Sequence, residues 1–319
     1  MAQKFLPFIT HLVNGVQKGA VDIFVQVGSP VQAKIKGHTV NLSDDVKLTQ
    51  YMVQQYIEDM YVKMAQRPKE LMDHISDEEF SFVIPDVARF RASVYHQRGT
   101  LGAVIRIVAF NVPSFKDLNI PESVMELADV ASGLVLVSGL TCCGKSTTQA
   151  CLVDRINHSR DCHIITVEEP IEFVHRNDLS FITQREIPLD APDMNVAVRS
   201  AMRQAPDVLV LSNLPNSDII SKAINTAESG HLVIGVIDAP KPVNAISKIV
   251  NAFPNEQHEM ILNQLANCLV ADISQRLIPQ ENGELVPEFE VLRNSYEVSD
   301  LIREGKLKDL ARYTNMIGE

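Results

Sequence analysis

The eight residues from Gly139 to Ser146, which read GLTCCGKS, constrain this chain more than any other segment. They match the phosphate-binding pattern G-x-x-x-x-G-K-[ST] in full. The apolar run LVLVS before the loop predicts a buried strand, and STTQACLVDRIN after it predicts a helix. Because chance rarely supplies strand, loop and helix together, the segment predicts a nucleotide-binding site.

Each part of this loop has an expected role. Glycines let backbone N–H groups wrap around phosphates, beside a helix N-terminus that favours anions. Lys145 is expected to meet the β- and γ-phosphate oxygens, and the hydroxyl of Ser146 or Thr147 to help hold Mg²⁺. ATP and Mg²⁺ are therefore the expected ligands. The predicted binding set in this loop is Gly139, Thr141, Cys142, Cys143, Gly144, Lys145, Ser146 and Thr147.

Two of these residues are adjacent cysteines, for which two interpretations remain open. Cys142 and Cys143 either fill the loop as small side chains or, beside a helix N-terminus, become reactive thiols whose oxidation hinders binding. The chain has 5 cysteines and no C-x-x-C pair. This usage predicts neither a disulfide framework nor a four-cysteine zinc site.

Composition narrows the class of protein. A chain of 319 residues, 45% of them hydrophobic, is long enough for two domains with cores of their own. The net charge of −11 argues against a general nucleic-acid binder, including a nucleic-acid translocase, and against a basic membrane anchor. The sequence contains no apolar run of transmembrane length, and its first residues lack the pattern of a signal peptide. We therefore expect a cytoplasmic protein.

The second half of the chain predicts a doubly wound α/β domain over residues 122–319, with a helical tail from about Asn255. Short apolar runs typical of buried parallel strands alternate with helical patterns. The predicted strands are Leu134–Val137, His163–Val167, Val208–Leu211 and His231–Ile237; the predicted helices are Ser146–Asn157, Val196–Arg203 and Ile219–Glu228.

The first half, residues 1–110, predicts an α+β domain with a mixed sheet. Helical patterns occupy Lys4–Lys18 and the region Tyr51–Met64, the second capped by Ser43–Asp45. The predicted strands are Ala20–Gly28, Val31–Ile35, Phe80–Ile84, Arg89–Tyr95 and Leu101–Val108. Residues 111–121, with two prolines and few periodic apolar residues, are the expected linker.

Further motifs in a fixed order resemble the bacterial type IV pilus retraction ATPases over nearly the whole chain. They are ITVEEPIEFVH (165–175), QRE (184–186), RSAMRQAPDVLVL (199–211), ESGHLV (228–233) and ISQRL (273–277). The resemblance implies a PAS-like first domain, a RecA-like second domain and a hexameric cytoplasmic motor. It also implies a pilus platform protein in the inner membrane as a partner, with the ATPase peripheral to that membrane.

The resemblance also implies roles for individual residues. Glu168, Glu169 and Glu172 fall in the acidic box, where carboxylates order Mg²⁺ or the attacking water; Glu169 joins Ser146 as a metal ligand. A solvated acidic loop is the alternative. His231 is the candidate γ-phosphate sensor, with a hydrogen-bonded core histidine as the alternative.

Four first-domain arginines are implied to reach the nucleotide at a subunit boundary, or else to form salt bridges within their own sheet. They are Arg89, Arg91, Arg98 and Arg106; of these, Arg98 and Arg106 are the predicted nucleotide ligands.

Two departures from the family pattern bear on catalysis. The strand after Pro206-Asp207 ends in Ser212-Asn213, where the family has a glycine and the glutamate that polarises water. Loss of a general base typically costs about 10²–10⁴-fold in rate. Asp238 replaces a histidine, so a carboxylate faces the γ-phosphate region.

Two functions remain open on these residues. One is a hexameric ATPase that powers pilus retraction and twitching motility, with Glu169, Glu172 or Asp238 serving as base. The other is an ATP-binding, largely non-hydrolysing subunit that modulates a competent paralogue in a mixed ring.

Overall fold

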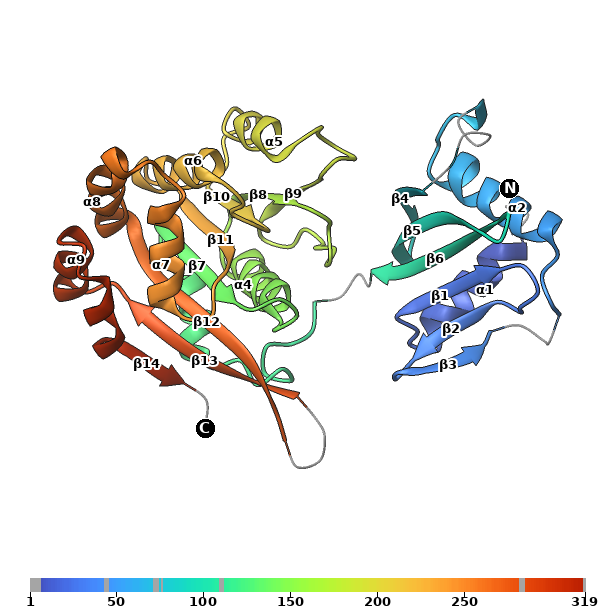
Figure 1. Cartoon of the computed structure of the whole chain (residues 1–319), viewed down its shortest axis with the longest axis horizontal. Coiled ribbons are helices and arrows are strands. Elements are labelled where there is room, and N and C mark those ends of the chain that lie inside the picture. The colour runs from blue at the N-terminus through green and yellow to red at the C-terminus, as the bar shows by residue number, and fades with distance from the viewer. Residues whose placement is uncertain are drawn as a thin grey trace. The chain divides into compact units, whose positions relative to one another are not determined.

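The computed structural model describes residues 7–42, 46–70, 75, 77–108, 112–280 and 285–317. The chain divides into two compact units, Met1–Phe110 and Asn111–Glu319 (Figure 1). The predicted cap Ser43–Asp45, the first residue of the expected linker and the start of the helix expected from Lys4 lie outside the described residues. No described helix is both long enough and apolar enough to cross a bilayer.

Within its described residues, the first unit has a six-stranded sheet of order β3-β2-β1-β6-β5-β4. Every neighbouring pair is antiparallel, which corrects the predicted mixed sheet. The strands are β1 (Asp22–Gln26), β2 (Gln32–Ile35), β3 (His38–Asn41), β4 (Asp77–Ile84), β5 (Ala88–Gln97) and β6 (Thr100–Val108).

Helices α1 (Pro7–Gln17) and α2 (Gln50–Glu58) supply the rest of this core, and a π-helical segment, Asp59–Met64, continues α2. The rings of Phe8 and Tyr56 stack with centroids 4.6 Å apart and join the two helices. Helix α2 is capped by Thr49, whose hydroxyl oxygen accepts a hydrogen bond from the backbone N–H of Met52 at 3.2 Å.

The second unit is built on an eight-stranded sheet of order β14-β13-β12-β7-β11-β10-β8-β9 among the described residues. Strands β12, β7, β11, β10, β8 and β9 pair in parallel, and β13 and β14 are antiparallel additions. The strands are β7 (Gly133–Gly139), β8 (His163–Glu168), β9 (Phe181–Glu186), β10 (Val208–Leu211), β11 (Leu232–Asp238), β12 (Leu269–Pro279), β13 (Leu285–Arg293) and β14 (Thr314–Ile317).

Helices cover both faces of this sheet (Figure 1). Along β7, Leu134 and Leu136 face one apolar core while Val135 and Val137 face the other, as expected for a strand buried on both sides. The helices are α3 (Glu122–Met125), α4 (Lys145–Ser159), α5 (Met194–Ala201), α6 (Ser217–Glu228), α7 (Pro242–Asn251), α8 (His258–Cys268) and α9 (Tyr296–Arg303).

Two sequence expectations differ from this fold. The segment after Asn255 contains α8 and α9, but strands β12, β13 and β14 extend the sheet where a helical tail was predicted. The expected linker is only partly a linker, because Val112, Phe115 and Leu118 pack against the core of the second unit.

The candidate site lies where the carboxyl ends of the parallel strands meet. In the strand register, Asp238 at the end of β11 lies opposite Gly139 at the end of β7, and Leu211 at the end of β10 lies opposite Val167 on β8. Loops that follow parallel strands at their carboxyl ends form the usual ligand crevice of such sheets.

Asp272 is a buried acid within this sheet. One carboxylate oxygen accepts a hydrogen bond from the Ser138 hydroxyl at 2.7 Å, and the other has no hydrogen-bond partner. Burial raises the pKa of Asp272 to about 7. Between about pH 4 and pH 7 the folded chain therefore holds a proton that the unfolded chain has released, and the free energy of unfolding falls as the pH rises through this window.

We expect Asp272→Asn to remove this dependence, because an amide carries no proton to lose. Between about pH 5 and pH 8 the free energy of unfolding should shift by about 1–3 kcal/mol in favour of the variant relative to wild type. Urea unfolding across this range measures the shift, with the exposed Asp161→Asn as control. A difference between Asp272→Asn and wild type that is constant with pH contradicts the expectation.

Candidate nucleotide-binding site

The phosphate loop depends on two glycines with positive φ. Gly139, at φ +150°, ends β7, and Gly144, at φ +92°, precedes the first residue of α4. A Cβ on Gly139 would lie 2.5 Å from both Cys143 Sγ and the Gln275 carbonyl oxygen. The loop therefore packs too closely against β12 for any side chain at Gly139.

Gln275 on β12 anchors the phosphate loop through two hydrogen bonds. Its amide nitrogen donates a hydrogen bond to the Cys143 carbonyl at 2.8 Å, and its amide oxygen accepts one from the Thr148 hydroxyl at 2.5 Å. All of these groups are buried, so each bond also prevents an unpaired polar atom. The sequence marked ISQRL only as a family motif and did not indicate this role.

The ammonium group of Lys145 is already surrounded by acceptors. It donates to the carbonyl oxygens of Gly139 at 3.1 Å and Leu140 at 2.7 Å, and it lies 2.9 Å from Asp238 Oδ1. The Lys145 side chain is 9% exposed, whereas that of Asp238 is 54% exposed. Lys145, the predicted phosphate ligand, therefore forms an ion pair with Asp238.

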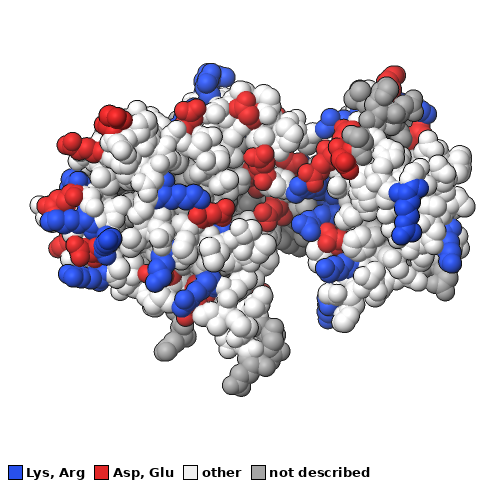
Figure 2. All heavy atoms as spheres, viewed as in Figure 1, with Lys and Arg blue, Asp and Glu red and all other residues white. Residues whose placement is uncertain are grey.

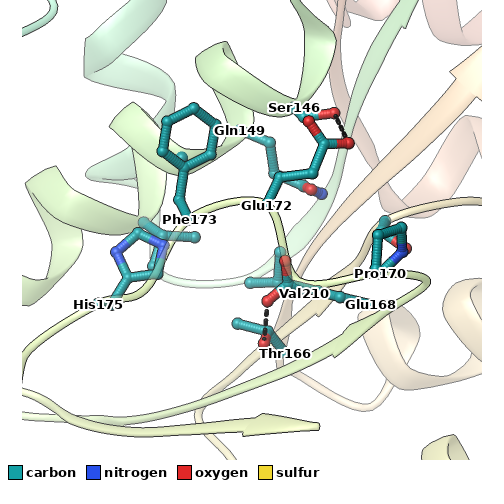
Figure 3. Close-up of a pocket in the computed structure, with 12 residues that line it drawn as sticks. Ser146, Gln149, Thr166, Glu168, Pro170, Glu172, Phe173, His175 and Val210 are labelled. Carbon is teal, nitrogen blue, oxygen red and sulfur yellow. Dashed lines mark hydrogen bonds between the residues drawn. The ribbon is translucent and has the colours of Figure 1, made fainter. Parts of the chain in front are cut away.

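The acidic box follows β8 beside this loop. Ser146 donates a hydrogen bond from its hydroxyl to Glu172 Oε1 at 2.9 Å (Figure 3). Glu168 Oε1 accepts from the Thr166 hydroxyl at 2.6 Å and from the Gln184 amide at 3.0 Å. Burial raises the pKa of Glu168 to about 7 despite these two bonds. An acid with this pKa exchanges protons near neutral pH.

Between these groups lies a cavity of about 20 Å³, large enough for one water molecule. Its polar wall includes Ser146, Glu168, Glu172 and Ser212. His175 also lines it, with its Nδ1 buried and unpartnered, and burial lowers the pKa of this imidazole to about 4. The cavity is therefore lined by both neutral and acidic polar groups, and it lies at the carboxyl ends of the parallel strands, beside the phosphate loop.

Glu169 is placed by its backbone more than by its side chain. Its N–H donates to the Ser212 hydroxyl at 3.1 Å, and its carboxylate is exposed. Ser146, the other predicted metal ligand, bonds to Glu172 and not to Glu169. Among the described residues, no three His, Cys, Asp or Glu side chains are arranged to hold a metal ion.

The end of β10 carries no carboxylate. Asn213 is exposed, and its side-chain oxygen accepts a hydrogen bond from the backbone N–H of Leu214 at 2.8 Å. An amide at this place orients a water molecule but cannot take its proton. The candidate site thus has a phosphate loop and no carboxylate at the end of β10.

His231 requires a correction. It precedes β11 at the amino end of the strand, whereas the phosphate loop lies at the carboxyl end, about 20 Å away at the usual rise per residue. Its Nδ1 instead lies 3.0 Å from the Ser229 hydroxyl and 3.2 Å from the Thr226 carbonyl. The hydrogen-bonded alternative describes this histidine, which does not sense phosphate within its own chain.

The two predicted arginine ligands lie in the first unit. Arg106 Nε is 2.9 Å from Asp22 Oδ1, an ion pair within the sheet. Arg98 is exposed in the turn between β5 and β6. A role for either at a subunit boundary stays a prediction.

The adjacent cysteines differ in environment. Cys142 is exposed and has φ +64°, a left-handed conformation that favours glycine. Cys143 is buried, and burial raises the pKa of its thiol although the nearby Lys145 opposes the shift. Cys143 therefore behaves as a loop filler, and accessible thiol chemistry in the loop is confined to Cys142.

A second pocket, of about 240 Å³, opens beside the phosphate loop on the side of α4. Gly144, Thr147 and Gln275 line it where it meets the loop. Residues 117–120 and the β12–β13 hairpin, through Leu277 and Leu285, form its outer wall. Part of the expected linker therefore contributes to the site, which the sequence did not indicate.

Comparison with known proteins shows which family the chain matches. The family described as "Type II/IV secretion system protein" matches residues 11–298. The chain is 33% identical over 305 residues to the type IV pilus retraction ATPase PilT of Pseudomonas aeruginosa, covering 95% of this chain and 87% of that protein. The type IV pilus ATPase PilU of the same organism is 32% identical, with 92% and 76% covered.

Solved structures agree with these sequence matches. The pilus retraction motor PilT with bound ADP matches with a TM-score of 0.87 and 36% identity, covering 97% of this chain and 89% of that one. The Legionella pneumophila ATPase DotB matches with a TM-score of 0.79 at 22% identity, covering 97% and 88%, and so shares the fold.

We expect Gln275→Leu to weaken the phosphate loop, because it leaves the Cys143 carbonyl and the Thr148 hydroxyl buried without partners. The free energy of unfolding should fall by about 1–3 kcal/mol. Urea unfolding measures this, with the exposed Gln257→Leu as the matched control. Equal stability of the two variants would show that Gln275 does not hold the loop.

Proposed function

This chain belongs to the type II/IV secretion system protein family, among the type IV pilus retraction ATPases, and from this premise we propose that it binds Mg-ATP at Gly139–Thr147 but hydrolyses it slowly. Three features of the loop support phosphate binding. They are the positive φ angles of its glycines, the hydrogen bond from Gln275 to the Cys143 carbonyl, and the start of α4 directly after the loop. The 240 Å³ pocket beside Thr147 is the expected seat of the nucleoside.

The observation that carries slow hydrolysis is the end of β10, where Ser212 and Asn213 stand without a carboxylate. Loss of a general base removes about 10²–10⁴-fold in rate. Asp238 is a second reason to expect slow hydrolysis, because its carboxylate forms an ion pair with Lys145, the residue that should neutralise phosphate charge. Both features leave the phosphate loop itself intact.

The described residues that would hold Mg²⁺ are Ser146, through its hydroxyl, and the acidic-box carboxylates Glu169 and Glu172. Oxygen donors of this kind suit Mg²⁺, which would neutralise phosphate charge when bound. Glu168 remains a candidate base, since its pKa of about 7 and its place on the small cavity suit proton exchange with a water molecule.

In the cell, we propose that the chain is an ATP-binding subunit of a cytoplasmic hexameric ring. Alone or mixed with a competent paralogue, this ring would act on a pilus platform protein at the inner membrane. Binding without turnover shifts the conformation of a subunit and so modulates its neighbours. A ring that powers retraction itself is the second candidate, and the poised Glu168 is the observation that favours it. On the face shown in Figure 2, the Lys and Arg side chains are interspersed with Asp and Glu side chains, whereas a nucleic-acid binder typically gathers its basic residues on one face.

Steady-state ATP turnover of the purified chain tests the proposal, with Lys145→Ala prepared identically as the control for contaminating ATPases. We expect turnover close to the control, together with ATP binding that Lys145→Ala abolishes. Turnover well above the control would show that another acid serves as base and would favour the motor. Binding that is insensitive to Lys145→Ala would reject the site.

Restoring the family residues is the complementary test. We expect Asn213→Glu with Asp238→His to raise turnover by about 10-fold or more, because the first supplies a base and the second frees Lys145. Asn213→Gln with Asp238→His is the matched control, since it has the length of the glutamate without a charge. Equal turnover of the two double variants would contradict a missing base as the cause of slow hydrolysis.

A further inference from the structure

The ammonium group of Lys145 has no donor to spare. A lysine ammonium carries three N–H donors, and three acceptors surround this one: the carbonyls of Gly139 and Leu140 and the Asp238 carboxylate. The two carbonyls belong to the loop itself. Asp238 is the acceptor that carries a negative charge, as a phosphate oxygen would.

Asp238 is held at this place by its backbone. Its register partner on β7 is Gly139, and the next residue, Ala239, forms an isolated bridge with the same glycine. From the other side, Lys248 Nζ donates a hydrogen bond to the Asp238 carbonyl at 2.9 Å. The carboxylate therefore extends from a fixed strand end to the mouth of the loop.

The lysine of a phosphate loop meets the β- and γ-phosphates of a bound nucleotide. A diphosphate presents only the first of these, so Lys145 can bind it while it keeps Asp238 on the other side. A triphosphate brings a further charged group to the region that Asp238 occupies. The carboxylate must then leave its ion pair or remain close to a like charge, and both cost free energy.

We propose that Asp238 takes the place of the terminal phosphate on Lys145, so that the site prefers a nucleoside diphosphate over the triphosphate. This inference rests on the nucleotide binding proposed above and names the nucleotide state that the site selects. It makes Asp238 a residue that determines nucleotide specificity, beyond its standing where the resemblance implies a histidine. It also gives the chain a resting state in which a single side chain supplies part of the charge that ATP would bring.

The test is the affinity for ADP and ATP of wild type and Asp238→Asn, measured by isothermal titration calorimetry in EDTA, where no hydrolysis competes. We expect Asp238→Asn to lower the Kd for ATP by about 10-fold or more, from the loss of one close like charge. The Kd for ADP should change by less than about 3-fold. Asp161→Asn, which removes an exposed charge just before the amino end of β8, should change neither affinity. Repeating the titrations with Mg²⁺ should preserve the order.

Each of the following results would overturn the inference. Equal tightening of ADP and ATP would mean that Asp238 competes with phosphate in general, and unchanged affinities would mean that the ion pair costs nothing to break. Weaker Mg-ATP binding by Asp238→Asn would show that the carboxylate supports the triphosphate through the metal. If neither nucleotide binds in a Lys145-dependent way, the proposed function fails as well; Lys145-dependent binding without a change in preference rejects this inference alone.

Discussion

The position of β7 between two parallel neighbours is the constraint on which the site depends. On one side β12 brings Gln275 beneath the phosphate loop, and on the other β11 brings Asp238 to its mouth. Because parallel pairing aligns the carboxyl ends of strands, both side chains meet the loop without any long connecting segment. The same pairing excludes a side chain at Gly139, since the loop must pass against the β12 backbone.

The parts of the fold that the sequence predicted well are those where apolar residues alone decide the structure. The strands β7, β8, β10 and β11 are mainly apolar and largely buried, and they lie where their patterns predicted them. Strand β12 was taken for part of a helical tail because Asp272, Ser274 and Gln275 interrupt its apolar pattern. Their burial is explained by partners distant in the sequence, such as Ser138 and Thr148, which no local pattern reveals.

The candidate site shows the same division. Motif spacing identified the loop and the family resemblance implied the acidic box, but a motif does not say at which end of a strand a residue lies. His231 and Asp238 bracket one strand, and only the register with β7 shows that Asp238 reaches Lys145 while His231 is at the far edge. Packing likewise decides which acid is poised: among the acidic-box glutamates, Glu168 has a pKa raised by burial, whereas Glu169 and Glu172 are exposed.

Charge connects the two departures from the family pattern. In the proposed function, Asn213 at the end of β10 supplies no base, while Asp238 at the end of β11 places a negative charge beside Lys145, the predicted phosphate ligand. Either change alone would slow ATP hydrolysis. A site with a base but no free lysine lacks charge stabilisation, and a site with a free lysine but no base lacks proton transfer. The backbone of the loop, with its glycines and its hydrogen bond from Gln275, does not depend on either residue. In the proposed function, a subunit of this kind would respond to nucleotide through occupancy of the loop, and its output would be the conformation that an occupied loop favours.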